Sequence, residues 1–390
     1  ADILAHLTKG VSGVKKLKHD DLYSKYIDAG VFGTVDYSLD YGFSRRDRKT
    51  MGPVSYYACQ VAKETLEMAN PGEDFITSGR MGVAFGSTHG SPIVQRNLYQ
   101  ALFDDTHEGY SSIKAVDYLK FMVHTTAVNI TKMFGITGRV ISSSTACTTS
   151  SQSIGFGYEM IKYGMQDAML CGGADEYDMS TVAVFDNLMA CSTDYNDTPH
   201  LTPRPFDRDR DGLVVGEGAG AVLLESYESA RKRDADILAE VIGFSCNNNG
   251  GDLILPNRDG ITQTIKLGLK DAAVRPDAVD FISAHATATK HGDAIEAQAT
   301  GSVYGKLPVV SGLKSYTGHT MGSCGVIESI MTIYMMQEGF VVPTLNLDHV
   351  DDQCAMLRHA REMMDADIRI AAIQNFAFGG VNTCLILKKP

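Results

Sequence analysis

Residues 140–164, VISSSTACTTSSQSIGFGYEMIKYG, are the stretch that decides the fold. Val140 and Ile141 end an apolar strand, small residues follow, and Cys147 sits at the turn into a mostly apolar helix. Small side chains around Cys147 allow one backbone segment to approach another closely. A thiol in the first turn of a buried helix faces unpaired N–H groups and the positive end of the helix dipole. We expect this placement to lower the pKa of the thiol and make Cys147 a nucleophile, although the stretch by itself also fits a buried structural cysteine.

The composition is that of a globular chain with a large core: 390 residues, of which 44% are hydrophobic and 21% charged. A net charge of −12 argues against bulk binding to nucleic acid. The eight cysteines are scattered and form no C-x-x-C pair, which favours a reducing compartment without disulfides, zinc or another metal. Because the sequence shows neither a run of transmembrane length nor a signal peptide, we expect a soluble, cytoplasmic protein that does not enter the membrane.

Strand and helix patterns alternate along the chain, which predicts an α/β fold. MGVAFGST at 81–88 and DAMLCGGADE at 167–176 have the pattern of buried strands that end in glycine turns. The glycine-rich segment LVVGEGAGAVLLES at 213–226 predicts a hairpin at the centre of a sheet.

One supersecondary plan occurs twice: a strand, a loop of small residues and an apolar buried helix, at 140–163 and again at 308–337. The charged segment ESARKRDA, 228–235, is the best candidate for a link between the two copies. The chain is therefore predicted to consist of two similar halves, residues 1–228 with the cysteine and residues 229–390.

Three further elements fall where strands run into loops, the place where α/β sheets carry their chemistry. His285 ends the apolar strand VDFISAH, Lys314 and His319 lie in SGLKSYTGHTMGSCG, and NFAFGGVN spans 375–382. A lone histidine is more often structural than catalytic. Two histidines and a lysine that all flank apolar strands and small residues favour a reactive site. The glycines of FAFGG also allow a backbone N–H to approach a reacting atom.

Taken in order, STACTTS, RPFDRDRDGLVVGEGAGAVLLE, HATAT followed by GDAIEAQA, GLKSYTGHTMGSCG and NFAFGGVN resemble the β-ketoacyl-acyl carrier protein synthases. More narrowly, they resemble the elongating class of type II fatty acid synthesis and the polyketide ketosynthase domains. The resemblance covers nearly the whole chain. It implies the thiolase fold, five layers α-β-α-β-α built from two βα halves, a homodimer, and a further strand before Ala1.

The resemblance also implies the reaction, a decarboxylative Claisen condensation of malonyl-carrier with an acyl group held on Cys147. The product is a 3-oxoacyl-carrier in chain elongation. The backbone N–H groups of Cys147 and Phe378 are expected to form the oxyanion hole. Two neutral imidazoles, His285 and His319, are expected to stabilise the enolate. Lys314 is expected to hold the histidines and to form a charge pair with Glu296.

The substrate arrives on the phosphopantetheine arm of an acyl carrier protein, so no separate cofactor is expected. Thr287, Thr289 and Phe378 match positions at which the family binds this arm. A monovalent cation near the site is compatible with the resemblance, but no cluster in the sequence demands one.

The chain departs from the family pattern at four positions near the pantetheine tunnel and the acyl gate: Ala286, Ala288, Ala377 and Leu213. Glycine is usual at the first and third of these, serine or aspartate at the second, and an aromatic residue at the fourth. These changes leave the catalytic set intact, and they leave chain-length preference undefined.

Acyl carrier proteins are acidic, so a chain with net charge −12 needs a local basic surface to bind one. The densest basic cluster is Arg45, Arg46, Arg48 and Lys49. Basic residues are unfavourable at the start of a helix, where the helix dipole favours acidic ones. Their presence here therefore suggests that this cluster binds the carrier protein. The family also has basic residues here that face the carrier.

Other functions within the superfamily fit less well. A thiolase has a second cysteine where His319 stands, and an initiating synthase has His and Asn rather than two histidines. A ketosynthase of a specialised polyketide or polyene pathway is the close alternative. A non-catalytic partner subunit that shapes the acyl tunnel is a different class, and such subunits typically lack the cysteine that this chain has.

Overall fold

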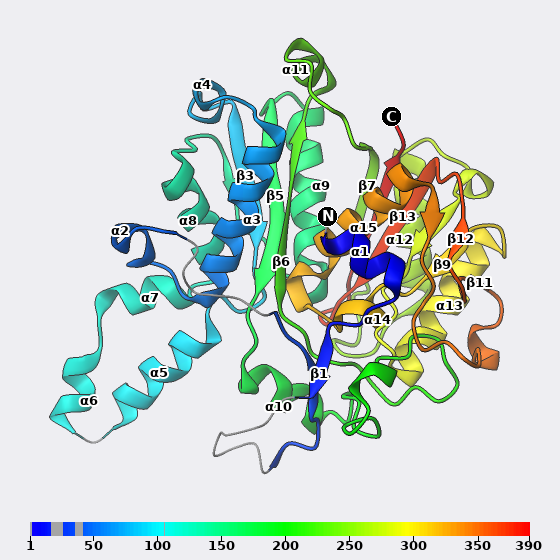
Figure 1. Ribbon diagram of the computed structural model, residues 1–390, viewed down its shortest axis with the longest axis horizontal. Coiled ribbons are helices and arrows are strands. Elements are labelled where there is room, and N and C mark those ends of the chain that lie inside the picture. The colour runs from blue at the N-terminus through cyan, green and yellow to red at the C-terminus, as the bar shows by residue number, and fades with distance from the viewer. Residues whose placement is uncertain (1, 17–25, 36–41, 105) are drawn as a thin grey trace.

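The computed structural model describes residues 2–16, 26–35, 42–104 and 106–390, and two large sheets organise it (Figure 1). The first has the strand order β4-β3-β5-β6. These strands are Val140–Ile141, Met81–Gly86, Ala168–Asp175 and Gly218–Glu225. Strand β3 runs parallel to β4 and β5, and β6 pairs antiparallel with β5.

The second sheet has the order β11-β9-β8-β13-β14-β7. Its strands are Arg358–His359, Val309–Ser311, Phe281–Ser283, Ile370–Phe376, Val381–Lys388 and Glu240–Asn248. The first four are parallel neighbours, while β14 is antiparallel to both β13 and β7. Since β8 and β9 are adjacent and parallel, the loops that follow them leave from the same edge of the sheet.

Helices α9, Thr149–Lys162, and α15, Cys324–Glu338, lie between the two sheets and contact strands of both (Figure 1). Helices α3, Pro53–Ala69, and α8, Thr125–Phe134, cover the outer face of the first sheet. Helix α12, Arg258–Asp271, with α13, Lys290–Tyr304, covers the outer face of the second. This order of layers is α-β-α-β-α, and the predicted α/β thiolase fold is confirmed.

The remaining elements are short or connect these layers: α1 Asp2–Lys9, β1 Val14–Lys16, β2 Val31–Gly33, α2 Arg45–Arg48, α4 Glu73–Ile76, α5 Pro92–Phe103, α6 His107–Ser112, α7 Ala115–Phe121, α10 Met179–Asn187, α11 Tyr227–Lys232, α14 Lys314–Thr317, β10 Phe340–Val341 and β12 Met364–Asp365. Ala1, before which the resemblance places another strand, lies outside the described residues. Within the described part of the chain, no helix has both the length and the apolar character needed to cross a membrane.

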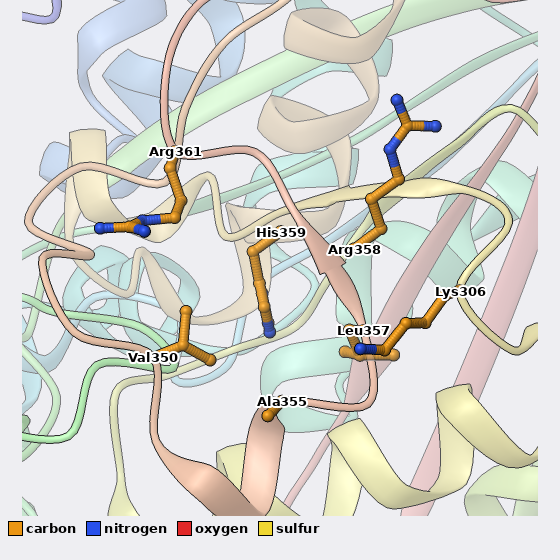
Figure 2. Close-up of a pocket in the computed structure, with 7 residues that line it drawn as sticks. All are labelled: Lys306, Val350, Ala355, Leu357, Arg358, His359 and Arg361. Atoms are coloured by element: carbon orange, nitrogen blue, oxygen red, sulfur yellow. The ribbon is translucent and has the colours of Figure 1, made fainter.

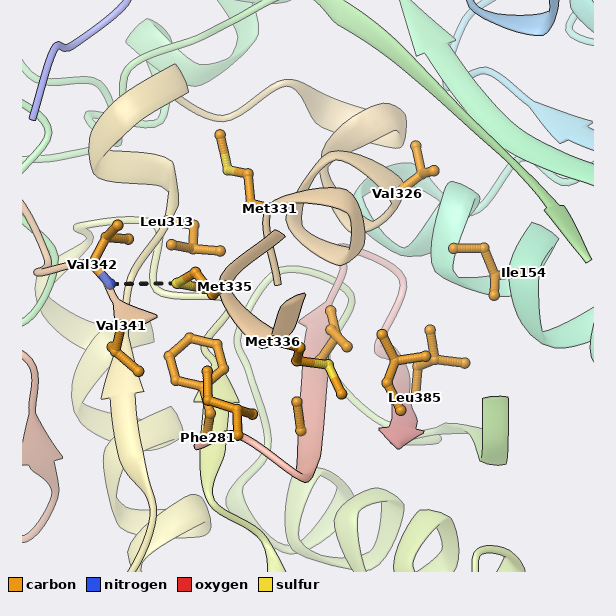
Figure 3. Packing of buried hydrophobic residues seen from close by; sticks show 14 of the residues in the cluster. Ile154, Phe281, Leu313, Val326, Met331, Met335, Met336, Val341, Val342 and Leu385 are labelled. Carbon is orange, nitrogen blue, oxygen red and sulfur yellow. Dashed lines mark hydrogen bonds between the residues drawn. The ribbon is translucent and has the colours of Figure 1, made fainter. Parts of the chain in front are cut away.

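The middle layer is held by apolar packing between the sheets (Figure 3). One buried cluster contains Met331, Met335 and Met336 of α15, Phe281 of β8 and Ile154 of α9. The two central helices also approach closely, because a methyl group on Gly325 would collide with the Ser151 hydroxyl. This close contact places the start of α9 beside the start of α15.

The predicted hairpin at 213–226 is wrong. Residues 218–225 form the single strand β6, which lies at the edge of the first sheet rather than at its centre. The preceding residues leave the sheet and make isolated bridges, including one between Val215 and His319. The hydrogen bonds that a hairpin would use instead join this segment to the loop that carries His319.

Candidate active site

Cys147 lies in a strained turn at the start of α9. The turn is the short helix η2, Ala146–Thr148, and Ala146 has a left-handed backbone with φ +48°. Such a conformation is uncommon for a residue with a side chain and is a feature of functional turns. The thiol is 7% exposed, so it is reached from within the protein rather than from the open surface.

Two imidazoles surround the thiol. His319 Nε2 lies 2.9 Å from Cys147 Sγ, and the rings of His285 and His319 have centroids 5.4 Å apart. His285 follows β8, whereas His319 follows α14 and Gly318, whose φ of +70° turns the chain back. Burial lowers the pKa of both histidines, and the nearby ammonium of Lys314 lowers them further. Both rings are therefore neutral and able to donate a hydrogen bond.

A buried ion pair sits behind the histidines. Lys314 Nζ lies 2.5 Å from Glu328 Oε1 and 3.2 Å from His285 Nδ1. Asn375 Nδ2 donates to Glu328 Oε2 at 2.8 Å and lies 3.5 Å from His285 Nδ1. Two donors thus face the Nδ1 atom of His285, which assigns its proton to Nε2 on the side away from the ion pair.

The predicted pair between Lys314 and Glu296 is wrong, because Glu328 forms it. Glu296 is buried in α13, and its two oxygens accept the backbone N–H groups of His285 and Ala286, each at 2.7 Å. Burial raises the pKa of Glu296 to about 8. Its carboxylate fixes the backbone of the His285 loop and does not reach the thiol, so Glu296 is a positioning residue.

The expected decrease in the pKa of Cys147 is also wrong. Burial raises the pKa of this thiol to about 11, while Lys314 and the backbone N–H groups of Cys147 and Phe378 lower it by less. Desolvation of the thiolate outweighs the N–H groups because the site is closed to solvent. The two N–H groups that act on the sulfur are those predicted for the oxyanion hole, one from each half of the chain.

The loop after β8 carries the two predicted pantetheine residues. Thr287 Oγ1 and Thr289 Oγ1 lie 3.1 Å apart, and both residues are half-buried. Ala286 and Ala288 around them have φ of +26° and +65°. Both alanines therefore occupy backbone conformations that favour glycine or a polar residue, which is where this chain departs from the family pattern.

Phe378 lies in the turn after β13 and is 36% exposed. Its ring packs on that of Phe185 at a centroid distance of 5.6 Å. Gly379 and Gly380, with φ of +84° and +71°, shape this turn, and Ala377 precedes it. Leu213 is buried in a cluster with the same Phe185. Leu213 and Phe378, both near the predicted acyl gate, therefore belong to packing that shares Phe185.

The predicted docking residues lie far from the thiol in sequence and on a different element. Arg45, Arg46 and Arg48 form the short helix α2, Lys49 follows it, and all four side chains are exposed. None of the four makes an ion pair with another described residue. The Lys132 ammonium approaches the carbonyl of Arg46 at 3.4 Å and adds a further positive charge to this surface.

The residues that sequence reasoning missed are Glu328 and Asn375. Glu328 stands alone as a buried carboxylate in the apolar helix α15, and that isolation was the available signal. Asn375 opens the NFAFGGVN motif, and its amide joins Glu328 to His285. A candidate set of metal-ligating atoms is also present, because one such atom each of Cys147, His285 and His319 lies within 4.8 Å of the others. The same thiol and imidazole groups are those that a reaction at the Cys147 sulfur needs.

A separate pocket lies at the outer edge of the second sheet (Figure 2). Its lining consists of Lys306, Val350, Ala355, Leu357, Arg358, His359 and Arg361. None of the predicted site residues belongs to this pocket, and its basic residues Lys306, Arg358 and Arg361 are exposed.

Comparisons with known proteins show the family of the chain. The family model for the β-ketoacyl synthase N-terminal domain matches residues 2–230, and the model for the C-terminal domain matches residues 238–348. The chain is 32% identical over its whole length to 94% of the Escherichia coli K12 protein named 3-oxoacyl-[acyl-carrier-protein] synthase 1.

Solved structures give the same result. A β-ketoacyl synthase from Burkholderia phymatum has a TM-score of 0.94 and 40% identity, over 99% of this chain and 94% of that one. A ketosynthase solved with its type II polyketide acyl-carrier protein, AntDE:AntF, has a TM-score of 0.88 and 27% identity, over 99% and 94% of the two chains. The chain belongs to the β-ketoacyl synthase family and is an acyltransferase of the 3-oxoacyl-carrier-protein synthase type.

Proposed function

We propose that this chain joins an acyl group held on Cys147 to the two-carbon unit left when carrier-bound malonyl loses carbon dioxide. The observation that carries the proposal is the 2.9 Å approach of His319 Nε2 to Cys147 Sγ, with a second neutral imidazole beside it. A thiol next to two neutral N–H donors suits a reaction that needs first a nucleophile and then an enolate stabiliser.

In the acylation step, Cys147 sulfur attacks the thioester carbonyl of the acyl-carrier. Because burial raises the thiol pKa to about 11, the thiol proton is passed within the closed site to the departing sulfur, and His319 Nε2–H, 2.9 Å away, donates to the Cys147 sulfur as its charge develops. The oxyanion forms against the N–H groups of Cys147 and Phe378. The carbon–sulfur bond to the pantetheine arm then breaks, and the departing sulfur receives the proton.

In the condensation step, the carboxylate of malonyl-carrier leaves as carbon dioxide, and its bonding electrons form an enolate. The enolate oxygen accepts from Nε2–H of His285 and of His319. The enolate carbon attacks the acyl-Cys147 carbonyl, and the carbon–sulfur bond to Cys147 breaks. The 3-oxoacyl-carrier leaves, and the Cys147 thiolate takes up one proton from water to regenerate the thiol. Lys314 and Asn375 support this role, since they face Nδ1 of His285 and keep its proton on Nε2.

The test is mass spectrometry of the whole protein. After incubation with a saturated acyl-carrier, the mass should increase by one acyl group on Cys147, and adding malonyl-carrier should remove it and give a 3-oxoacyl-carrier. An unchanged mass in the presence of active acyl-carrier would instead support the non-catalytic partner subunit.

A specialised polyketide pathway is the second candidate, and the similarity to the AntDE ketosynthase favours it. The two candidates differ in the substrate chain, since fatty acid elongation uses saturated acyl groups. A ladder of acyl-carriers that contains saturated and polyunsaturated chains of matched length separates them. A preference for saturated chains in kcat/KM supports fatty acid elongation.

The partner in this proposal is an acidic acyl carrier protein that docks on Arg45, Arg46, Arg48 and Lys49 and inserts its phosphopantetheine arm past Thr287 and Thr289. The four basic side chains are exposed and lack carboxylate partners among the described residues. The cytoplasmic location, the absence of a separate cofactor and the division into residues 1–228 and 229–390 belong to the same proposal.

We also propose a homodimer. Helices α5, α6 and α7 extend from the body of the molecule (Figure 1), and several large apolar side chains on them are exposed. Phe103 is 80% exposed, Tyr110 71% and Tyr118 57%. Exposed apolar surface of this kind marks interaction sites, and aromatic residues are enriched at the core of protein–protein interfaces. Analytical ultracentrifugation tests the homodimer: the wild type should sediment as a dimer and a Phe103→Asp, Tyr110→Asp double variant as a monomer. A monomeric wild type would contradict the proposal.

A further inference from the structure

Asp175 ends strand β5 and is buried, yet it makes no ion pair with any residue that the structure describes. Its Oδ1 accepts the Ser87 hydroxyl at 2.7 Å and the Thr88 backbone N–H at 2.9 Å. Its Oδ2 accepts the Thr88 hydroxyl at 2.6 Å and the backbone N–H of Gly322 at 2.7 Å. Each oxygen thus has one hydroxyl and one obligate backbone donor.

The contact with Gly322 crosses from the first half of the chain to the second. Gly322 lies in the short helix η5, Met321–Ser323, which begins two residues after His319. A Cβ at Gly322 would be 2.8 Å from Asp175 Oδ2 and 2.9 Å from Thr88 Oγ1, so the two segments have no spare room. The His319 loop has a second tie to the first half, because the His319 backbone N–H donates to the carbonyl oxygen of Val214 at 2.7 Å.

We propose that Asp175 is a positioning residue for condensation: its carboxylate fixes the His319 loop of one half against the Cys147 turn of the other. This inference rests on the proposed function of His319. Since His319 and Cys147 come from different halves, their separation depends on ties of this kind. A misplacement of about 1 Å costs such a site about 100-fold in rate.

Only a carboxylate satisfies this arrangement. Both oxygens must accept from a backbone N–H, so an asparagine in the same place turns its NH₂ group toward one of them, whichever way it is oriented. The affected N–H, on Thr88 or Gly322, is then left buried without an acceptor. With the NH₂ group in place of Oδ2, the contact that holds η5 is lost; with the NH₂ group in place of Oδ1, the Thr88 segment that packs against Gly322 is pushed apart instead. The shape of the side chain is unchanged in both cases.

Glu176 supplies a matched control. It is also buried, and its oxygens accept the backbone N–H groups of Val54 at 2.7 Å and Ile93 at 3.1 Å, with the Ser91 hydroxyl at 2.8 Å. Glu176→Gln therefore creates the same chemical defect one residue away. All of its hydrogen-bond partners lie in the first half, so this defect leaves the His319 loop untouched.

The charge of Asp175 gives an independent readout. Lys314 lowers the pKa of the Cys147 thiol and Asp175 raises it, whereas the Glu176 carboxylate is held by Val54, Ser91 and Ile93. Burial raises the pKa of the Asp175 carboxyl, and the hydrogen bonds from Thr88, Ser87 and Gly322 together with nearby His89 oppose this increase. Removing the Asp175 charge should therefore shift Cys147 titration to lower pH, and removing the Glu176 charge should not.

The experiment compares Asp175→Asn and Glu176→Gln with the full-length wild type. Asp175→Asn should lower kcat for condensation by about 10-fold to 100-fold with KM for both carriers unchanged, because only the His319 geometry is disturbed. The pH midpoint of Cys147 alkylation by iodoacetamide should fall in Asp175→Asn alone. Glu176→Gln should keep the wild-type kcat and midpoint, even if its melting temperature falls.

Equal losses of kcat in the two variants, or a wild-type kcat and midpoint in Asp175→Asn, would overturn the inference. If Asp175→Asn does not fold, Gly322→Ala strains the same contact from the other half while keeping the charge, and it should lower kcat with KM unchanged. A wild type that fails to condense would contradict the proposed function, and the alkylation midpoints would still decide whether Asp175 acts on Cys147.

Discussion

In the first half of the chain, Ala146 has a left-handed backbone, with φ +48°, and opens η2 and the buried helix α9. In the second half, Met321 has nearly the same φ, +49°, and opens η5 and the buried helix α15. The backbone plan is thus the same on both sides. The side chains differ. The first turns of α9 bury hydroxyl groups, whereas α15 buries methionines and one carboxylate, Glu328.

The difference assigns separate tasks to the two halves. The first half presents the sulfur, and the second half supplies both imidazoles and the ion pair behind them. Where the first half has Cys147 after its left-handed residue, the second has Gly322, which leaves room for Asp175. A duplicated framework therefore brings a nucleophile and its electrostatic support together from opposite sides of one interface.

The largest expected effect comes from removing the one reactive group of the first half. Cys147→Ala should abolish condensation, because no acyl-enzyme can form. Decarboxylation of malonyl-carrier should persist, since its enolate is stabilised by groups of the second half. Release of labelled carbon dioxide, measured beside 3-oxoacyl product, separates the two activities. Condensation at near wild-type rate would remove Cys147 from its role.

The next effect distinguishes two buried carboxylates of the second half. Glu328→Gln leaves the Lys314 ammonium buried without its ion partner, and breaking such a pair costs about 3–5 kcal/mol of stability. Glu296→Gln leaves one backbone N–H unpaired, which costs about 1–3 kcal/mol. Urea unfolding should therefore show the larger decrease for Glu328→Gln. The reverse order would mean that Glu296 is the true partner of Lys314.

This pair of glutamates shows what the sequence could predict and what it could not. His285, Lys314 and His319 were predictable because each adjoins an apolar strand and small residues in a recognisable motif. Their carboxylate partner was not, since Glu296 on α13 and Glu328 on α15 are both buried acids near the site, and only three-dimensional packing decides which one reaches Lys314. Glu296 instead accepts two backbone N–H groups of the loop after β8, those of His285 and Ala286.

Other differences have the same physical origin. The apolar periodicity around Met81–Gly86 and Ala168–Asp175 predicts strands correctly, because local burial determines it. The segment before β6 has equally apolar residues but pairs with the His319 loop, a contact that no local pattern encodes. Likewise, the helix start at Cys147 suggests a lowered pKa, and the desolvation that raises it depends on the whole surrounding fold.

A smaller effect comes from the imidazoles. His285→Ala and His319→Ala should each slow carbon–carbon bond formation by about 100-fold or more, the usual cost of losing an oxyanion donor. Acylation of Cys147 should be affected less, because its oxyanion uses backbone N–H groups. Single-turnover assays of the two steps make the comparison. A variant that condenses normally but fails to acylate would show that its histidine serves the first half's chemistry instead.

The smallest effect for each residue is expected at the surface, where the two halves carry comparable basic groups. Arg45, Arg46 and Arg48 form α2 in the first half, while Lys306, Arg358 and Arg361 surround the pocket of the second half (Figure 2). Each exposed contact is worth only about 0.2–1 kcal/mol, so single variants will look mild. Reversing all three charges of α2 to glutamate should raise KM for acyl-carrier strongly and leave kcat unchanged.

The same triple reversal around the second-half pocket is the matched control, since it changes the net charge of the chain equally. It should leave KM nearly unchanged if docking is local to α2, and raise it to the same degree if the carrier responds only to overall charge. Activity with a small acyl-pantetheine thioester should be unaffected in both variants, because such a substrate has no carrier surface. Added salt should weaken carrier binding to the wild type and narrow its difference from the α2 variant. An unchanged KM in the α2 variant at low salt would place the docking surface on another part of the molecule.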